Sequence, residues 1–190
     1  MKPINTQYKG YLFRSRLEAR WAVFFDALGL EWRYEMEGYE LSNGEFYLPD
    51  FNVKGACDFE TPPSMRWDFV EIKATTPSAE EIKKMDLLTK AMHRGHYTDG
   101  GFGLILSGDP ADHFVYSFCG CGSCIDEVVT YENDIADRFW AWKTGNDEKQ
   151  LTDIYRAATK ARSARFEFAD AEQRLTRMPL TRRGIDGNHP

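Results

Sequence analysis

Hydrophobic residues recur at helical spacing in the first part of the chain. Leu17, Trp21, Phe24, Phe25 and Leu28 would lie on one face of a helix. Ser15 and Glu18 have the spacing of a capping box, in which the Ser15 hydroxyl accepts from a backbone N–H and Glu18 reaches back to the Ser15 N–H. Gly29 suits the position after a helix end. The pattern therefore predicts a helix that starts after Ser15 and stops before Gly29.

Two aromatic and β-branched runs, Tyr47–Phe51 and Phe69–Lys73, are typical of β-strands. Residues two apart in a strand point to the same face, so Glu71 and Lys73 should project together while Ile72 faces the other way. Asp50 ends the neighbouring strand. The sequence thus predicts two carboxylates and an ammonium group at adjacent strand ends.

The remaining pattern favours an α/β fold with a mixed central β-sheet flanked by helices. Ser78 and Glu81 form a second capping box, which opens a helix running to about His93. Phe102–Leu106 and Phe114–Tyr116 are predicted strands. We expect a domain over residues 1–130, followed by a helical extension over 131–190 with a frayed basic tail. Helices are expected at 134–142 and, as one or two helices, from Leu151 to about Met178.

Composition supports one folded domain with an appendage. The chain has 190 residues, of which 42% are hydrophobic and 14% aromatic, enough for a substantial core. No apolar run approaches the roughly 18 residues that a membrane span needs, and the N-terminus lacks the apolar segment of a signal peptide. We therefore expect a soluble, cytoplasmic protein without a membrane partner.

The motif residues resemble a known family. Pro49-Asp50 followed by Glu71-Ile72-Lys73 is similar to the signature of the PD-(D/E)XK nuclease superfamily. Residues 15–20 resemble the first helix of that fold, which often adds an acidic residue, here Glu18. The order of elements is closest to the phage endonuclease I-type junction-resolving enzymes. The resemblance covers roughly the first 110 residues and implies a restriction-endonuclease-like fold.

The resemblance also implies a chemistry. Asp50, Glu71 and the backbone carbonyl of Ile72 would bind Mg²⁺ or Mn²⁺, with Glu18 supporting the site or binding a second ion. The metal would polarise a phosphate oxygen and lower the pKa of a bound water. Lys73 would orient that water, and arginine should not replace it. The expected activity is cleavage of branched or processed DNA in phage or mobile-element recombination or replication, by a homodimer or within a larger complex.

Simpler interpretations remain open for each residue. Glu18 could be only a helix cap, Asp50 a turn residue, and Glu71 with Lys73 a surface ion pair of little energetic weight. The chain could then be a catalytically silent relative that binds nucleic acid or a partner. An exonuclease or a nuclease subunit of a larger complex is a further alternative.

Net charge is unfavourable for a DNA-binding protein, because phosphate neutralisation supplies most nonspecific affinity. The formal net charge is −6. Basic residues nevertheless gather near the first helix, and we expect DNA contacts at Lys9, Arg14, Arg16 and Arg20. The C-terminal basic residues Arg156, Lys160, Arg162 and Arg165 could follow a DNA backbone, but a solvated charged face is the more common reason for such a pattern.

Four cysteines suggest a possible structural metal. Cys119, Cys121 and Cys124 are clustered, with His113 or Cys57 as the fourth ligand of a Zn²⁺ ion, and His93 or His96 as further options. The spacing departs from the usual paired Cys-x-x-Cys pattern. An iron–sulfur cluster is a less favoured alternative, and reduced thiols in a glycine-rich loop are the simplest one.

Overall fold

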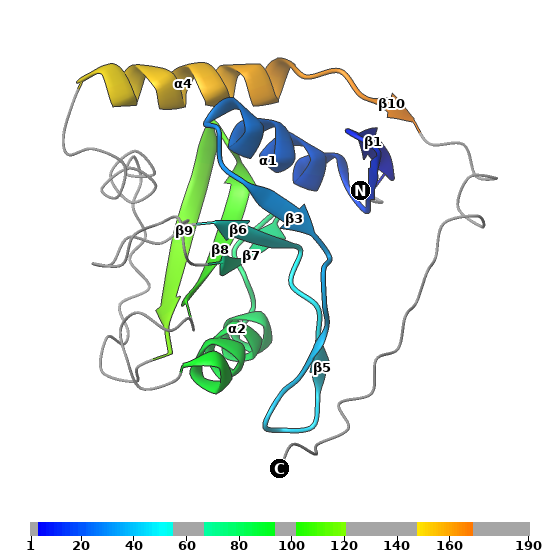
Figure 1. The fold of residues 1–190 in the computed structure, drawn as a ribbon, viewed down its shortest axis with the longest axis vertical. Helices are drawn as coiled ribbons and strands as arrows, with labels where there is room; N and C mark the ends of the chain where they lie inside the picture. The colour runs from blue at the N-terminus through cyan, green and yellow to red at the C-terminus, as the bar shows by residue number, and fades with distance from the viewer. Residues whose placement is uncertain (1–3, 55–66, 94–101, 121–147, 169–190) are drawn as a thin grey trace, which may run out of the picture.

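The computed structural model describes residues 4–54, 67–93, 102–120 and 148–168 and shows an α/β fold (Figure 1). Three helices and ten strands are present in these ranges. In chain order they are β1 (Thr6–Tyr8), β2 (Tyr11–Phe13), α1 (Arg16–Ala27), β3 (Trp32–Tyr34), β4 (Tyr39–Glu40), β5 (Phe46–Tyr47), β6 (Phe51–Lys54), β7 (Trp67–Lys73), α2 (Ala79–Met92), β8 (Phe102–Asp109), β9 (Asp112–Cys119), α4 (Glu148–Ser163) and β10 (Glu167–Phe168).

The central sheet has five strands in the order β3-β6-β7-β8-β9. All neighbouring pairs are antiparallel except β7 and β8, which run parallel with Val70 opposite Leu104. Helix α2 makes the crossover between these two strands, as a parallel pair requires. The mixed sheet predicted from the sequence is therefore confirmed.

Helices cover both faces of this sheet, with α1 and α4 on one face and α2 on the other (Figure 1). Double coverage explains why β7 is buried along nearly its whole length rather than on alternate residues. Val70 and Ile72 pack in the core under α1, whereas Phe69 packs in the core under α2. The side chains of Glu71 and Lys73 share the α2 face with Phe69, because strand residues two apart point the same way.

Helix α1 begins and ends as its sequence predicts. Ser15 is the N-cap, and its side chain accepts a hydrogen bond from the Glu18 N–H. At the other end the N–H of Leu30 donates to the Phe25 carbonyl at 2.9 Å, and Gly29 has a φ of 71°. This pair of features is a Schellman motif, in which glycine adopts the left-handed conformation at little cost.

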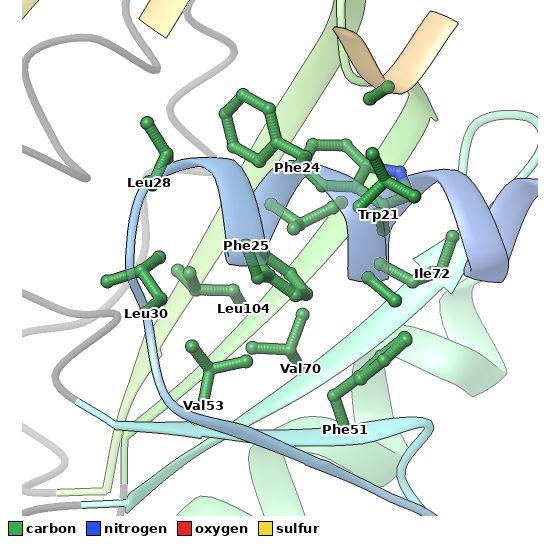
Figure 2. Packing of buried hydrophobic residues seen from close by; sticks show 14 of the residues in the cluster. Trp21, Phe24, Phe25, Leu28, Leu30, Phe51, Val53, Val70, Ile72 and Leu104 are labelled. Atoms are coloured by element: carbon green, nitrogen blue, oxygen red, sulfur yellow. The ribbon is translucent and has the colours of Figure 1, made fainter. Parts of the chain in front are cut away.

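Aromatic side chains from α1 fill the main core. Trp21, Phe24 and Phe25 are fully buried against Phe51, Val53 and Val70 of the sheet (Figure 2). The opposite side of α1 is covered by α4, whose Ile154, Ala157, Ala158 and Ala161 belong to the same core cluster. The predicted helical extension therefore contributes directly to the principal core.

Helix α2 packs closely on β8. Its capping box is complete, because the Ser78 side chain accepts from the Glu81 N–H and the Glu81 side chain accepts from the Ser78 N–H. Gly103 permits the close approach, since a Cβ there would lie 2.5 Å from the Met85 sulfur. This packing brings the N-terminal turn of α2 toward the end of β7 that carries Lys73, and an ion pair joins Lys73 to Glu81.

Some elements differ from the sequence prediction. Tyr47–Phe51 is not one strand: β5 ends at Tyr47 and β6 begins at Phe51, so Leu48, Pro49 and Asp50 connect two strands. Proline at 49 lacks the N–H that a continuous ladder would use. The hairpin of β1 and β2 was not predicted, and β10 pairs with β1 where a continuous helix was one option. The expected helix at 134–142 lies outside the described residues.

None of the described helices is both long and apolar enough to cross a bilayer.

Candidate active site

Glu18 is a buried carboxylate on the first turn of α1, with only 8% of its surface exposed. Its Oε2 atom accepts hydrogen bonds from the Arg14 N–H at 3.1 Å and from the Tyr34 hydroxyl at 2.5 Å. Its Oε1 atom accepts from the Ser15 hydroxyl at 2.6 Å. The predicted capping box is thus only half formed: Ser15 caps the helix, but Glu18 accepts from the N–H of Arg14 rather than from that of Ser15.

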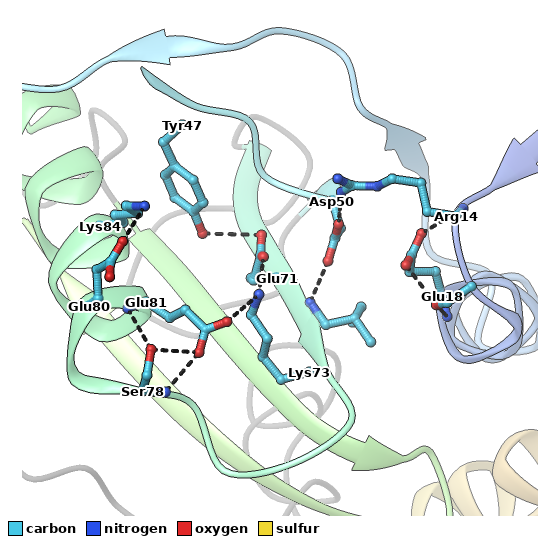
Figure 3. Close-up of polar contacts among 12 residues, drawn as sticks. Arg14, Glu18, Tyr47, Asp50, Glu71, Lys73, Ser78, Glu80, Glu81 and Lys84 are labelled. Carbon is cyan, nitrogen blue, oxygen red and sulfur yellow. Dashed lines mark hydrogen bonds and ion pairs between the residues drawn. The ribbon is translucent and has the colours of Figure 1, made fainter. Parts of the chain in front are cut away.

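Asp50 lies immediately before β6 and is 2% exposed. The register explains its orientation. Phe51 pairs with Val70 at the end of the β6–β7 ladder, so the N–H of Ile72 lies beyond the last strand pair. That N–H donates to Asp50 Oδ2 at 2.8 Å. Oδ1 accepts from Arg14 Nη2 at 2.6 Å (Figure 3).

Glu71 and Lys73 project together, as predicted from strand alternation. Lys73 Nζ lies 2.8 Å from Glu71 Oε1 and 2.8 Å from Glu81 Oε1. The Tyr47 hydroxyl donates to Glu71 Oε2 at 3.2 Å. Figure 3 shows Glu71 between the Lys73 ammonium and the Tyr47 ring, with Asp50 next along the sheet edge and Glu18 beyond it.

The electrostatics of the site are dominated by buried negative charge. Burial raises the pKa of Asp50 well above its usual range, and the nearby carboxylates of Glu71 and Glu18 raise it further. The Ile72 N–H and the Arg14 guanidinium act in the opposite direction but do not cancel this effect. The positive charges of the protein therefore do not fully offset the negative charge around Asp50. A further positive charge beside Asp50 would stabilise its ionised form.

Lys73 is held as a cation by its neighbours. Burial alone would lower its pKa, but the carboxylates of Glu71 and Glu81 outweigh burial and raise it. The hydrogen bonds from Lys73 and Ser78 in turn outweigh the burial of Glu81 and bring the pKa of Glu81 down to about 2. Lys73 is accordingly a hydrogen-bond donor and a point charge in this arrangement, and not a proton acceptor.

The donor set suits a hard divalent cation in its chemistry. Carboxylate oxygens from Asp50 and Glu71 are the ligands that Mg²⁺ prefers. A strand residue in an antiparallel ladder directs its N–H and C=O to the same edge, so the Ile72 carbonyl is directed to the edge at which its N–H meets Asp50. Within the described ranges, however, no group of three or more histidine, cysteine, aspartate or glutamate side chains is arranged as a metal site. Instead, Arg14 forms an ion pair with Asp50, and Lys73 forms one with Glu71.

The basic residues expected to contact DNA differ in their surroundings. Arg14 pairs with Asp50 and Glu35 inside the candidate site. Lys9 pairs with Asp26 at 2.8 Å, and Arg20 pairs with Asp109 at 2.9 Å. Arg16 is exposed on the first turn of α1. Arg14 is thus bonded to Asp50, one of the predicted metal ligands.

The predicted cysteine site is not assembled around His113. His113 and Cys119 are six residues apart on the continuous strand β9, a separation of roughly 20 Å at the rise of a β-strand. One Zn²⁺ ion cannot bind both side chains, so His113 is wrong as the partner of Cys119. His113 packs edge-on against Trp21, and the Cys119 thiol is buried in the main core cluster. Cys57, Cys121, Cys124 and His96 lie outside the described residues.

Four further side chains in the site were not predicted to act there: Tyr34, Glu35, Tyr47 and Glu81. Glu35 has a φ of 44°, and its N–H donates to the Asp50 carbonyl at 2.9 Å. The two tyrosines reach the site only because their strands end beside it, which single-sequence spacing does not reveal. Glu81 was recognised in the sequence as part of the α2 capping box. That role gave no reason to expect its ion pair with Lys73.

Comparison with known proteins adds no relative to these observations. No protein-family model matches the chain, and neither a curated protein nor a solved structure matches it.

Proposed function

We propose that this chain is a Mg²⁺- or Mn²⁺-dependent deoxyribonuclease of the PD-(D/E)XK type. One observation carries the proposal: Glu18, Asp50 and Glu71 converge from a helix, a strand connection and a strand, with Lys73 bonded to Glu71. Both glutamate carboxylates lie close enough to Asp50 to raise its pKa. A helix cap, a turn residue and a surface ion pair would have no reason to meet at one place.

Asp50, Glu71 and the Ile72 carbonyl would hold the cation in this proposal. When bound, a divalent ion supplies Lewis-acid polarisation of a phosphate oxygen and activation of a water for attack on phosphorus. Glu18 supports the site from its buried position, where Tyr34 and Ser15 fix its carboxylate. Tyr47 does the same for Glu71.

Lys73 would donate a hydrogen bond to the attacking water or to a phosphate oxygen. Its raised pKa keeps it charged at neutral pH, and a preorganised charge beside the phosphorus stabilises the negative charge that develops in the transition state. Glu71 and Glu81 hold the ammonium from two sides, which fixes its position before substrate arrives.

Branched or processed DNA in phage or mobile-element recombination or replication is the substrate class we propose, with cytoplasmic action as a homodimer or within a larger complex. The acidic total supports recognition of a DNA structure over indiscriminate backbone binding, since nonspecific affinity depends on phosphate neutralisation. A catalytically silent nucleic-acid- or protein-binding relative is the alternative.

A cleavage assay tests the proposal. Labelled four-way junction, flap, duplex and single-stranded DNA are incubated with Mg²⁺, Mn²⁺ or EDTA. We expect metal-dependent cutting by the wild type and a loss on the order of 100-fold or more in Asp50→Ala, Glu71→Ala and Lys73→Arg. The matched control is Lys84→Arg. Lys84 forms an ion pair with Glu80 on α2, outside the carboxylate cluster.

Two results would contradict this proposal. Cleavage that persists at the wild-type rate in folded Asp50→Ala or Glu71→Ala would show that the site is assigned wrongly. A folded wild-type protein that cuts none of the four substrates with either metal would favour the silent alternative.

A further inference from the structure

Arg14 has an unusual place in the candidate site. Its guanidinium joins two carboxylates, with Nε 2.7 Å from Glu35 Oε1 and Nη2 2.6 Å from Asp50 Oδ1. The side chain is nevertheless 57% exposed, whereas that of Asp50 is 3% exposed. An exposed cation thus covers a buried carboxylate at the edge of the site. Tyr34 is a further hydrogen-bond partner of the Arg14 side chain.

The main chain of Arg14 is fixed independently of its guanidinium. Its N–H donates to Glu18 Oε2 and to the Tyr34 hydroxyl, each at 3.1 Å. Both partners are buried, so the Cα of Arg14 is anchored beside the carboxylates whatever its side chain does. The exposed guanidinium can therefore exchange its partner without disturbing the fold of the β2–α1 connection.

Charge in the site favours such an exchange. Glu18, Glu35, Asp50, Glu71 and Glu81 face the two cations Arg14 and Lys73, a formal excess of three negative charges (five minus two). A divalent cation on Asp50 would remove two of these three charges. It would also need an Asp50 oxygen, and Oδ1 is the one that Arg14 now occupies.

We propose that Arg14 is the counter-ion of Asp50 in the metal-free protein and becomes a phosphate ligand when the cation and DNA bind. Glu35 retains Nε during the exchange, so the two Nη groups turn toward phosphate oxygens next to the cation. Guanidinium groups bind phosphate through paired N–H donors, a geometry that lysine cannot supply. This inference rests on the proposed nuclease function and assigns Arg14 a role beyond general electrostatic attraction.

Competition between Arg14 and the cation gives a signature that a merely structural role would not produce. Arg14→Gln removes the competitor for Asp50, so Mn²⁺ should bind the DNA-free variant about threefold more tightly than the wild type, as measured by EPR of free Mn²⁺. The same substitution removes the phosphate ligand. Binding of the DNA substrate in Ca²⁺ should then weaken about tenfold, as measured by fluorescence anisotropy.

Matched variants separate this effect from loss of any positive charge. Arg156→Gln removes an exposed arginine that also pairs with a carboxylate, Asp153, but on α4. We expect it to leave Mn²⁺ affinity unchanged. Glu35→Gln keeps Arg14 but weakens the ion pair that holds its guanidinium, so DNA affinity should fall in this variant as well. Arg14→Lys keeps a charge without the paired donors, and it serves as the test if Arg14→Gln does not fold.

The outcomes are distinguishable from those of the nuclease assay. Wild-type cleavage together with tighter Mn²⁺ binding and weaker DNA binding in Arg14→Gln supports the exchange. Unchanged or weaker Mn²⁺ binding in a folded Arg14→Gln, or unchanged DNA affinity, overturns the exchange and leaves the nuclease proposal standing. An Arg14→Lys variant that binds DNA as tightly as the wild type also overturns the exchange and leaves the nuclease proposal standing. A wild type that neither binds Mn²⁺ nor cuts DNA overturns both proposals.

Discussion

Two tyrosines determine how the carboxylates of the site are held. Tyr34 and Tyr47 are both buried, and each places its hydroxyl on a glutamate, Glu18 and Glu71 respectively. Burial and the adjacent negative charges raise the pKa of both hydroxyls above the ordinary value. Each tyrosine therefore remains a hydrogen-bond donor at all moderate pH values. A donor that cannot ionise is well suited to holding a carboxylate in one orientation.

His113 predicts a pH dependence of stability. Burial lowers its pKa to about 4, against an ordinary value of 6.5, although contacts with Asp109 and Pro110 act in the opposite direction. Between these values the unfolded chain binds a proton that the folded protein excludes, so stability falls as the pH is lowered from about 6.5 toward 4. The free energy of unfolding should fall by about 3 kcal/mol over this range through His113.

Urea unfolding of wild type and His113→Gln at pH 7 and pH 5 measures this effect. Other titrating groups contribute equally to both proteins, so the difference between their pH dependences isolates His113. We expect a smaller loss of stability at pH 5 in the variant. Parallel pH dependences would show that His113 titrates normally in the folded protein.

At the scale of elements, β7 organises the site. One face of the strand places Val70 and Ile72 in the core under α1, and the other places Glu71 and Lys73 beside α2. The strand also extends past the end of β6, which leaves the Ile72 N–H for Asp50. A single strand therefore positions two site residues and orients a third.

The N-cap of α2 is the element for which stability can be predicted most directly. The Ser78 side chain accepts from the Glu81 N–H at 3.3 Å and donates to Glu81 Oε2 at 2.9 Å. Ser78→Ala should lower the free energy of unfolding by about 1 kcal/mol, because a helix N–H loses its partner. Chemical denaturation measures this change.

Ser163→Ala is the matched control for the cap. Ser163 is exposed and lies at the C-terminal end of α4, where its hydroxyl donates to the Lys160 carbonyl. We expect its substitution to change stability by less than about 0.5 kcal/mol. Equal effects of the two substitutions would indicate that Ser78 contributes nothing as a cap.

Sequence patterns predicted the elements that depend on local signals. The ends of α1 and α2 follow from their caps, and the facing of Glu71 and Lys73 follows from strand alternation. The break between Tyr47 and Phe51 was missed, although Pro49 was visible, because aromatic residues on both sides suggested one strand. The role of Arg14 at Asp50 could not be predicted, since 36 residues separate the two in sequence and only the fold brings them together.

For the whole molecule, α4 is an integral layer of the structure. Its buried residues complete the core around α1, and Ala161 is fully buried there. The small side chains of Ala157, Ala158 and Ala161 allow the two helices to approach closely. The described part of the C-terminal region is therefore needed to cover α1, although it carries none of the proposed catalytic residues.

Ala161→Leu tests this arrangement. The larger side chain has no space between α4 and α1, so overpacking should lower the free energy of unfolding by about 1–3 kcal/mol. Lys160→Leu, at an exposed position one residue earlier, should have little effect on stability. Thermal unfolding of both variants measures the difference. Equal melting temperatures for Ala161→Leu and wild type would contradict the packing of α4 on α1.

The pairing of β1 with β10 has a consequence for how the protein is made. Thr6 pairs with Phe168, and α1 is covered by α4, so β1 and α1 are translated well before the elements that cover them. The side of α1 that packs on α4 must stay uncovered until α4 has been translated. Exposed apolar surface of this kind promotes aggregation of nascent chains. Slow translation without chaperones should therefore reduce the yield of folded protein.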